Sequence, residues 1–146
     1  MKLVTFIKTS AVSLAIVLGA ASPSLADGNY ANVHQWGWHN EAGGGQYGFG
    51  NRLTVDQGGW GNSSVALQDG NFNKTVIGQN GHHNGALTQQ YGRCNVAGIA
   101  QFGGHNNAST TQSGNCNASA TIQSGHGNSA NTTQRGSGNV SVIVQD

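Results

Sequence analysis

Apolar and polar residues alternate with a period of two inside a unit of eleven residues that repeats from Asn29 to Gln145. We number the unit so that Asn is position 1, Gln position 7 and Gly position 9. Positions 3 and 5 hold mostly small or β-branched residues, such as Ala97 and Ile99, and positions 1, 3, 5 and 7 carry no charge in any unit. A period of two is typical of β-strands whose alternate side chains face opposite sides. Odd positions are therefore predicted to face a dry interior and even positions to face outward.

The Asn and Gln of the unit recur every eleven residues without a gap, and two units make 22 residues. From residue 51 onward the two series comprise Asn51, Asn62, Asn73, Asn84, Asn95, Asn106, Asn117, Asn128, Asn139, and Gln57, Gln68, Gln79, Gln90, Gln101, Gln112, Gln123, Gln134, Gln145. An amide side chain donates and accepts hydrogen bonds, so amides stacked directly above one another can form a ladder. Such ladders satisfy buried polar groups and penalise a shift in register.

Position 9 is always Gly, which suits a turn that needs positive φ or a close backbone approach. The turn glycines of the regular units are Gly59, Gly70, Gly81, Gly92, Gly103, Gly114, Gly125, Gly136. We expect a strand of seven residues followed by a turn of four, so that two units close one coil. The predicted fold is all-β: a β-solenoid of about five 22-residue coils (11 half-units of 11 residues), with two parallel sheets and strands stacked ~4.8 Å apart.

The chain divides into three predicted segments. Residues 1–26 read as a secretory signal peptide, with Lys2 and Lys8 before a short apolar run and a small-residue cleavage site ending at Ala26. Residues 27–50 form a Gly- and aromatic-rich N-terminal segment with degenerate repeats, and residues 51–146 form the regular solenoid. The apolar run is too short to span a membrane, so an exported protein without a membrane span is expected.

Composition narrows the classes of function. Charged residues make up only 8% of the chain and the net charge is +1, so the sequence has no basic region typical of nucleic-acid binding. No set of residues resembles a catalytic centre or a cofactor site. Low charge, few prolines and abundant amides are instead typical of cross-β structure. We therefore expect neither an enzyme nor a cofactor.

The spacing Gln57-x4-Asn62-x5-Gln68 and its successors resembles the curlin repeat, as does the segment from Gln79 to Ala86. The resemblance covers nearly all of residues 29–146. It implies a curli fibre subunit, similar to the major subunit, that is exported through the periplasm and a dedicated outer-membrane pore with accessory factors. Such subunits polymerise with copies of themselves, with the help of a nucleator subunit, into extracellular amyloid fibres for biofilm matrix, adhesion and surface colonisation.

Two other functions stay open at this point. The chain is alternatively the minor nucleator subunit of the same fibre, or a monomeric ligand-binding β-solenoid. The latter class needs a regular outward array of Thr or aromatic residues, and position 4 shows none, as Val65, Leu87 and Gly98 illustrate. The last unit ends in the uncharged, β-prone segment 140–144, which indicates an exposed docking edge rather than a capped end.

His and Cys residues gather in the predicted turns. His82, His83 and His105 fall on one edge of the solenoid and are weak candidates for binding Zn²⁺ or Cu²⁺, because no carboxylate or thiol of that edge completes a site. Cys94 and Cys116 are 22 residues apart. Stacking at that spacing brings their Cα atoms within the range of a disulfide, and export makes oxidation plausible. We therefore regard this pair as a possible disulfide.

Overall fold

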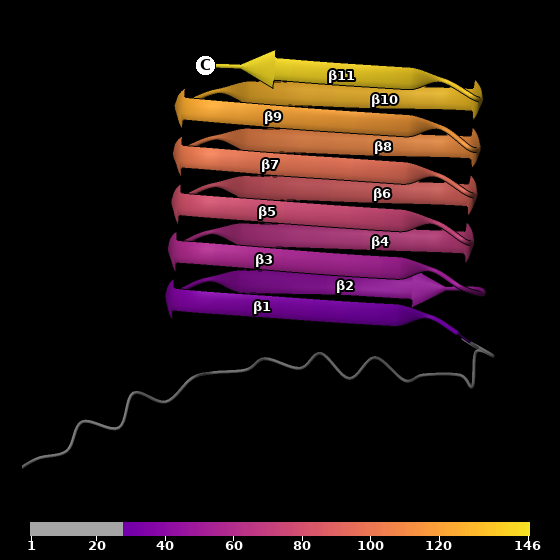
Figure 1. The fold of residues 1–146 in the computed structure, drawn as a ribbon, viewed down its shortest axis with the longest axis horizontal. Helices are drawn as coiled ribbons and strands as arrows, with labels where there is room; N and C mark the ends of the chain where they lie inside the picture. Colours follow the sequence, from indigo (N-terminus) through magenta and orange to yellow (C-terminus); the bar gives the residue numbers. More distant parts are fainter. Residues whose placement is uncertain (1–27) are drawn as a thin grey trace, which may run out of the picture.

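The computed structural model describes residues 28–146, which form a single stack of strands (Figure 1). The predicted signal peptide lies outside the described residues. The eleven strands are β1 (Tyr30–Trp38), β2 (Glu41–Tyr47), β3 (Arg52–Trp60), β4 (Ser63–Asn71), β5 (Lys74–His82), β6 (Gly85–Arg93), β7 (Val96–Gly104), β8 (Asn107–Asn115), β9 (Ala118–His126), β10 (Ser129–Ser137) and β11 (Val140–Gln145). Nothing in this part of the chain forms a helix long and apolar enough to cross a membrane.

The strands form two parallel sheets that face each other. Odd-numbered strands make a six-stranded sheet in the order β1-β3-β5-β7-β9-β11, which we call sheet A. Even-numbered strands make a five-stranded sheet in the order β2-β4-β6-β8-β10, which we call sheet B. Each strand pairs in parallel with the strand one coil away, so that Gln57 lies beside Gln79 and Gln79 beside Gln101. The predicted β-solenoid of two parallel sheets, with a coil of 22 residues, is confirmed.

The core lies between the two sheets and is narrow. From Asn51 to Gln134 the side chains at positions 1, 3, 5 and 7 are buried in almost every unit, whereas most outward positions are exposed. Its apolar part consists of small and branched residues, with Val55, Ile77 and Ile99 as the largest. The inward and outward assignment made from the period of two therefore holds for the regular units.

The strands are longer than the sequence predicts. Each interior strand continues from position 2 to position 10, nine residues in all, and only positions 11 and 1 stay outside the ladders, as with His83 and Asn84. The expected seven-residue strand and four-residue turn are therefore wrong. The physical reason is that each bend stacks on an identical bend one coil away, so backbone pairing continues through the bend at the position-9 glycine.

The first coil is less well covered than the others. Every residue of β1 is exposed, and Val33, which occupies an inward position, is 49% exposed. Opposite it, the inward position 5 of β2 is Gly44, which supplies no side chain to the interior. The rule that odd positions are dry therefore fails at this end of the stack, although both strands keep the common register.

Candidate functional site: amide ladders, turns and edges

Two continuous ladders of Gln side chains run through the interior. In sheet A the Nε2 of Gln57 donates to the Oε1 of Gln79 at 2.6 Å, and Gln79 donates to Gln101 at 2.8 Å. The same bond joins neighbours from Gln35 to Gln145 in sheet A and from Gln46 to Gln134 in sheet B. Each Gln between these ends therefore accepts from the preceding coil and donates to the next coil.

From Gln46 to Gln145, the second hydrogen of each ladder Gln amide connects one sheet to the other. Gln101 Nε2 also donates to the carbonyl oxygen of Gly85 at 2.9 Å, and Gln112 Nε2 to that of Val96 at 3.0 Å. Both acceptors belong to the preceding strand of the opposite sheet. One side chain thus fixes the register within its sheet and the spacing between the sheets.

The Asn side chains act mainly on the backbone, which the expectation of a simple amide ladder does not include. The Oδ1 of Asn62 accepts the backbone N–H of Asn84 at 3.1 Å, and its Nδ2 donates to the carbonyl oxygens of Gly58 and Gly81 at 2.9 and 3.1 Å. Most of the other buried Asn residues make similar bonds. Position 1 therefore holds the turn of its own coil against that of the next coil.

Buried hydroxyl groups do not form comparable ladders. Thr75 bridges Gln68 and Gln90, but six other buried hydroxyls of residues 28–146 have no hydrogen-bond partner. They belong to Ser64, Thr88, Thr110, Ser119, Thr121 and Thr132. The amides, not the hydroxyls, therefore carry the polar specificity of the core.

The glycine at position 9 meets two separate requirements. Gly59 has φ +103°, and a Cβ built there would overlap the carbonyl oxygen of Gly81 on the next coil. Gly81 stands in the same relation to Gly103. Because the obstacle is backbone, no side-chain rotation can relieve it, and only glycine fits.

Position 11 also has positive φ, and sequence reasoning missed it. His83 has φ 53°, Cys94 57° and His105 57°, although none is glycine. His39, Phe72 and Cys116 are the remaining non-glycine residues with positive φ in the described chain. The left-handed conformation costs an ordinary residue roughly 1–2 kcal/mol. The available signal was that the other four units that reach position 11 place glycine there, at Gly50, Gly61, Gly127 and Gly138.

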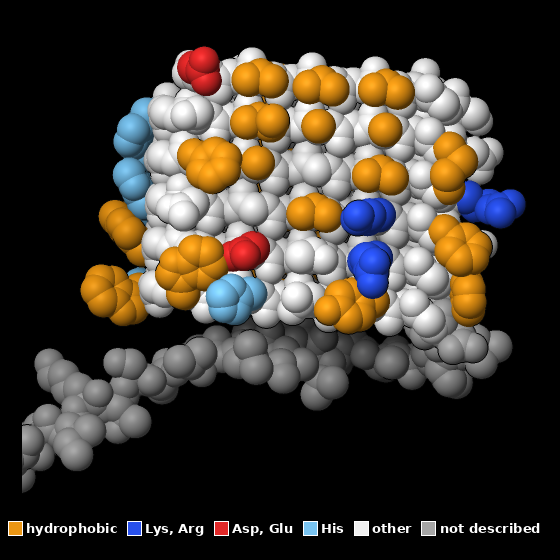
Figure 2. Space-filling view, viewed as in Figure 1, with side chains coloured by type: hydrophobic (Ala, Val, Ile, Leu, Met, Phe, Trp, Pro, Cys, Tyr) orange, Lys and Arg blue, Asp and Glu red, His pale blue; other side chains and the backbone are white. Residues whose placement is uncertain are grey.

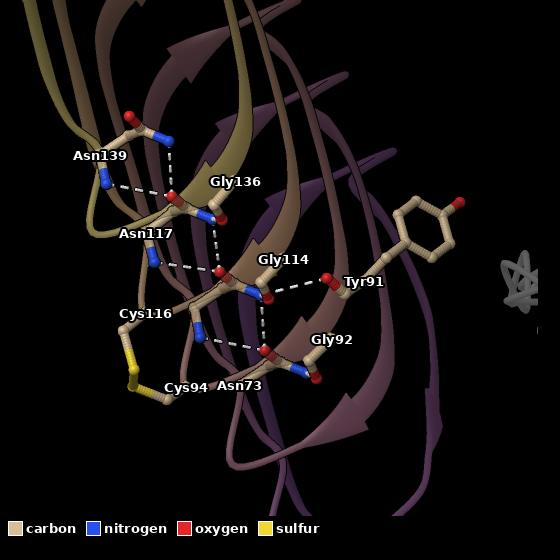
Figure 3. The surroundings of a disulfide bond; sticks show 10 residues. Asn73, Tyr91, Gly92, Cys94, Gly114, Cys116, Asn117, Gly136 and Asn139 are labelled. Atoms are coloured by element: carbon tan, nitrogen blue, oxygen red, sulfur yellow. Dashed lines mark hydrogen bonds between the residues drawn. A yellow bond between two sulfur atoms is a disulfide. The ribbon is translucent and has the colours of Figure 1, made fainter.

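The structure joins Cys94 and Cys116 by a disulfide, with their Cα atoms 4.5 Å apart (Figure 3). The bridge lies outside the two adjacent turns, beside the stacked Asn side chains that include Asn117. Both Cys residues also donate backbone N–H bonds to the preceding coil. The bond therefore closes one coil covalently at the edge that also carries Arg93.

The opposite edge gathers four imidazoles from three successive coils. His82 and His126 are separated by two coils but approach to 5.1 Å between ring centroids, because the intervening residue at position 10 is Gly104. His105 lies 5.4 Å from His82 and 5.8 Å from His126, and His83 stacks on His105 at 5.1 Å. We call His82, His83, His105 and His126 the imidazole cluster.

The imidazole cluster has a direct effect on its central member. Desolvation, followed by repulsion from His126, His105 and His83, lowers the pKa of His82 from its ordinary value of 6.5. Within residues 28–146, no three His, Cys, Asp or Glu side chains are arranged to hold a metal ion. The weak metal candidates His82, His83 and His105 are thus close together, but the structure does not turn them into a metal centre.

Fold and ladders together define the class: this is a β-solenoid repeat protein whose coils are registered by buried amides. The family model described as the curlin associated repeat matches residues 26–59 of the chain. The match confirms the resemblance to curlins that the Asn and Gln spacing indicates. No curated protein matches the chain. The matched residues include β1, β2 and nearly all of β3, and the same Asn and Gln register continues to Gln145.

Proposed function

We propose that this protein is a structural subunit of extracellular curli-like amyloid fibres, serving biofilm matrix, adhesion and surface colonisation. In this role it is exported through the periplasm and an outer-membrane pore, and a nucleator subunit starts its polymerisation with copies of itself. The curlin associated repeat at residues 26–59 supports this role. The proposed export is supported by the signal peptide predicted at residues 1–26.

The observation that carries the proposal is the open end of the stack at β10 and β11 (Figure 1). In a parallel sheet, alternate residues bond to opposite neighbours. The backbone N–H of Ala118 in β9 donates to Asn139 on the next coil at 2.8 Å, so position 2, and with it the other even positions, bonds toward the C-terminal end. In β11 the corresponding groups of Val140, Val142 and Val144 point out of the stack, and no strand among the described residues pairs with them. Such an edge is a template for another chain.

The buried amides make this edge selective for a copy of the same repeat. Gln134 and Gln145 each donate one amide hydrogen to the backbone, at 3.0 and 3.1 Å, but within residues 28–146 neither donates its second amide hydrogen to another Gln. At the other end, Gln35 and Gln46 donate to the next coil without receiving a bond from a preceding Gln. The two ends are therefore complementary, and a strand of different sequence would leave these amides unpaired, at about 1–3 kcal/mol for each buried group.

The proposal is tested with Val142→Pro. Proline removes the N–H that points out of the stack but leaves the bonds of β11 to β9, which come from the odd positions, and proline is tolerated in edge strands. We expect the purified mature wild-type chain to form thioflavin-positive fibres with a ~4.8 Å repeat. The rate of elongation on wild-type seeds should fall at least tenfold for Val142→Pro.

Val142→Ala is the matched control, because it removes the same side chain and keeps the N–H. It should elongate at nearly the wild-type rate. A wild-type chain that stays monomeric under all assembly conditions would contradict the fibre function. Equal rates for Val142→Pro and Val142→Ala would show that β11 is not the edge that accepts the next chain.

A further inference from the structure

Positions 2, 4 and 6 give β7, β9 and β11 an apolar outward surface, which appears as rows of orange side chains (Figure 2). Positions 2, 4 and 6 of these three strands hold only Val, Ile, Ala and Gly, and Val140, Val142 and Val144 are 76%, 66% and 63% exposed. On the opposite sheet the same positions of β8 and β10 hold only Asn, Ser and Thr. Because the same repeat builds both faces, the fold itself does not require an apolar outer surface. Continuous exposed apolar surface on a soluble protein marks an interaction site.

The relief of this face suits a second flat sheet. Its central column, position 4, consists of Gly98, Ala120 and Val142 in β7, β9 and β11. Side chains this small allow another sheet to approach to about 10 Å, the usual separation of packed sheets. Dry, closely packed contacts between small side chains of paired sheets are typical of cross-β assemblies. The face therefore fits a sheet better than a helix or a loop.

Arg52 and Asp56, two of the charged residues on the same face, are complementary to each other, whereas Lys74 at position 2 of β5 has the uncharged Gly78 at position 6 of its strand. Arg52 occupies position 2 of β3 and Asp56 occupies position 6, each two residues from Thr54 at the centre. Both charged groups remain exposed: the Asp56 side chain is 55% exposed and lies 3.8 Å from His34 Nδ1, and the Arg52 guanidinium lies 5.1 Å from the exposed Tyr30 ring. Consider a twofold axis that lies over position 4 and is parallel to the direction in which the coils stack. It places Arg52 of one copy opposite Asp56 of the other. The same operation places the apolar rows of β7, β9 and β11 on themselves.

We propose that the outward face of sheet A binds the same face of a second copy of this chain, around a twofold axis parallel to the direction in which the coils stack. Apolar contacts of β7, β9 and β11 provide most of the buried area. Two equivalent Arg52–Asp56 pairs set the orientation. This side-to-side contact is distinct from the end-to-end contact of β11 and does not need it.

Chemical cross-linking tests the contact. Ala120→Cys places a thiol at the centre of the proposed interface, and Asn131→Cys places one at position 4 of β10 on the opposite face. With the native disulfide intact, the new thiol is the only free one among the described residues. A bifunctional maleimide about 10 Å long matches the separation of packed sheets. We expect covalent dimers of Ala120→Cys in at least fivefold higher yield than of Asn131→Cys, and equal yields would overturn the proposal.

Charge exchange tests the orientation in the Ala120→Cys background. Arg52→Asp alone opposes two carboxylates across the interface, so the yield of cross-linked dimer should fall severalfold. Adding Asp56→Arg restores an opposite pair and should return the yield to at least half of its original value. If the double exchange stays as low as the single one, the twofold axis proposed here is wrong.

End-to-end and side-to-side association are separable in the same samples. Along one fibre, equivalent residues of successive chains are at least about 26 Å apart, because eleven strands form five and a half coils spaced by ~4.8 Å. The cross-linker therefore reports lateral contacts alone. Dimers of Ala120→Cys in a chain that never forms fibres would support this inference while contradicting the fibre function. Fibres without such dimers would do the reverse.

Discussion

At the residue scale, the buried amide is the unit of specificity. Gln101 accepts from Gln79 at 2.8 Å and donates to Gln123 at 2.9 Å, and it also donates to the Gly85 carbonyl oxygen on the opposite sheet. A hydrophobic contact tolerates a slip of register, whereas an amide that slips leaves its partners buried without hydrogen bonds. The buried amides therefore hold the strands in a single register.

Replacing one ladder residue measures this effect. Gln101→Leu removes three hydrogen bonds: it leaves an N–H of Gln79 and the Oε1 of Gln123 unpaired, and the Gly85 carbonyl oxygen loses its bond from the side chain. We expect a loss of about 1–3 kcal/mol for each buried group in the free energy of unfolding, measured with urea on the soluble chain. Ala100→Ser, on the outward face, should change it by less than about 0.5 kcal/mol. Similar effects of the two substitutions would refute the inward assignment of position 7.

At the scale of the element, some features of the half-coil and its bend can be predicted from the sequence and others cannot. Period and spacing predict the sheets, the register and the buried positions, because they follow from residues that recur with fixed chemistry. The length of the strands was not predictable in this way, since pairing through the bend depends on a neighbouring bend and not on local preference. The left-handed residue at position 11 was also hidden where a Cys or His occupies it, as at Cys94 and His83.

The two glycine positions of the bend should differ sharply in tolerance. Gly103 has φ +106° and faces the carbonyl oxygen of Gly125, whereas Gly127 has φ +72° and no atom within 4 Å of an added Cβ. Gly127→Ala should therefore cost only the left-handed conformation, roughly 1–2 kcal/mol. Gly103→Ala adds a clash with rigid backbone and should prevent a folded soluble chain, as judged by circular dichroism and protease resistance. Comparable losses from both would mean that the bends are not stacked as closely as described.

At the scale of the whole molecule, the two edges respond to different conditions. One edge carries the disulfide, and the other carries the imidazole cluster, whose members come from three successive coils. The pKa of His82 lies below its ordinary value in the folded state. The unfolded chain therefore takes up a proton more readily at this residue, and the folded state loses relative stability as the pH falls through 6.5 toward the lower folded pKa.

The lowered pKa of His82 predicts that acid destabilises the folded state and that this effect depends on His82. The urea midpoint of the wild-type chain should fall between about pH 8 and about pH 5, the range over which histidine titrates. His82→Gln removes the titrating group and should reduce that fall, while Asn80→Gln on the same strand should leave it unchanged. An identical pH dependence for wild type and His82→Gln would exclude the imidazole cluster as its source.

The odd number of strands has a consequence for the symmetry of a fibre. The stack of described residues begins with β1 in sheet A and also ends in sheet A, with β11. A second chain that continues both sheets without a gap must place its β1 on β10 and its β2 on β11. This arrangement rotates the second chain by half a turn about the direction in which the coils stack. Successive chains would then present the apolar face alternately on opposite sides, and a chain with one half-coil more or fewer would present it on one side only. The parity of the repeat number thus decides whether fibres can associate laterally in pairs or extend into ribbons.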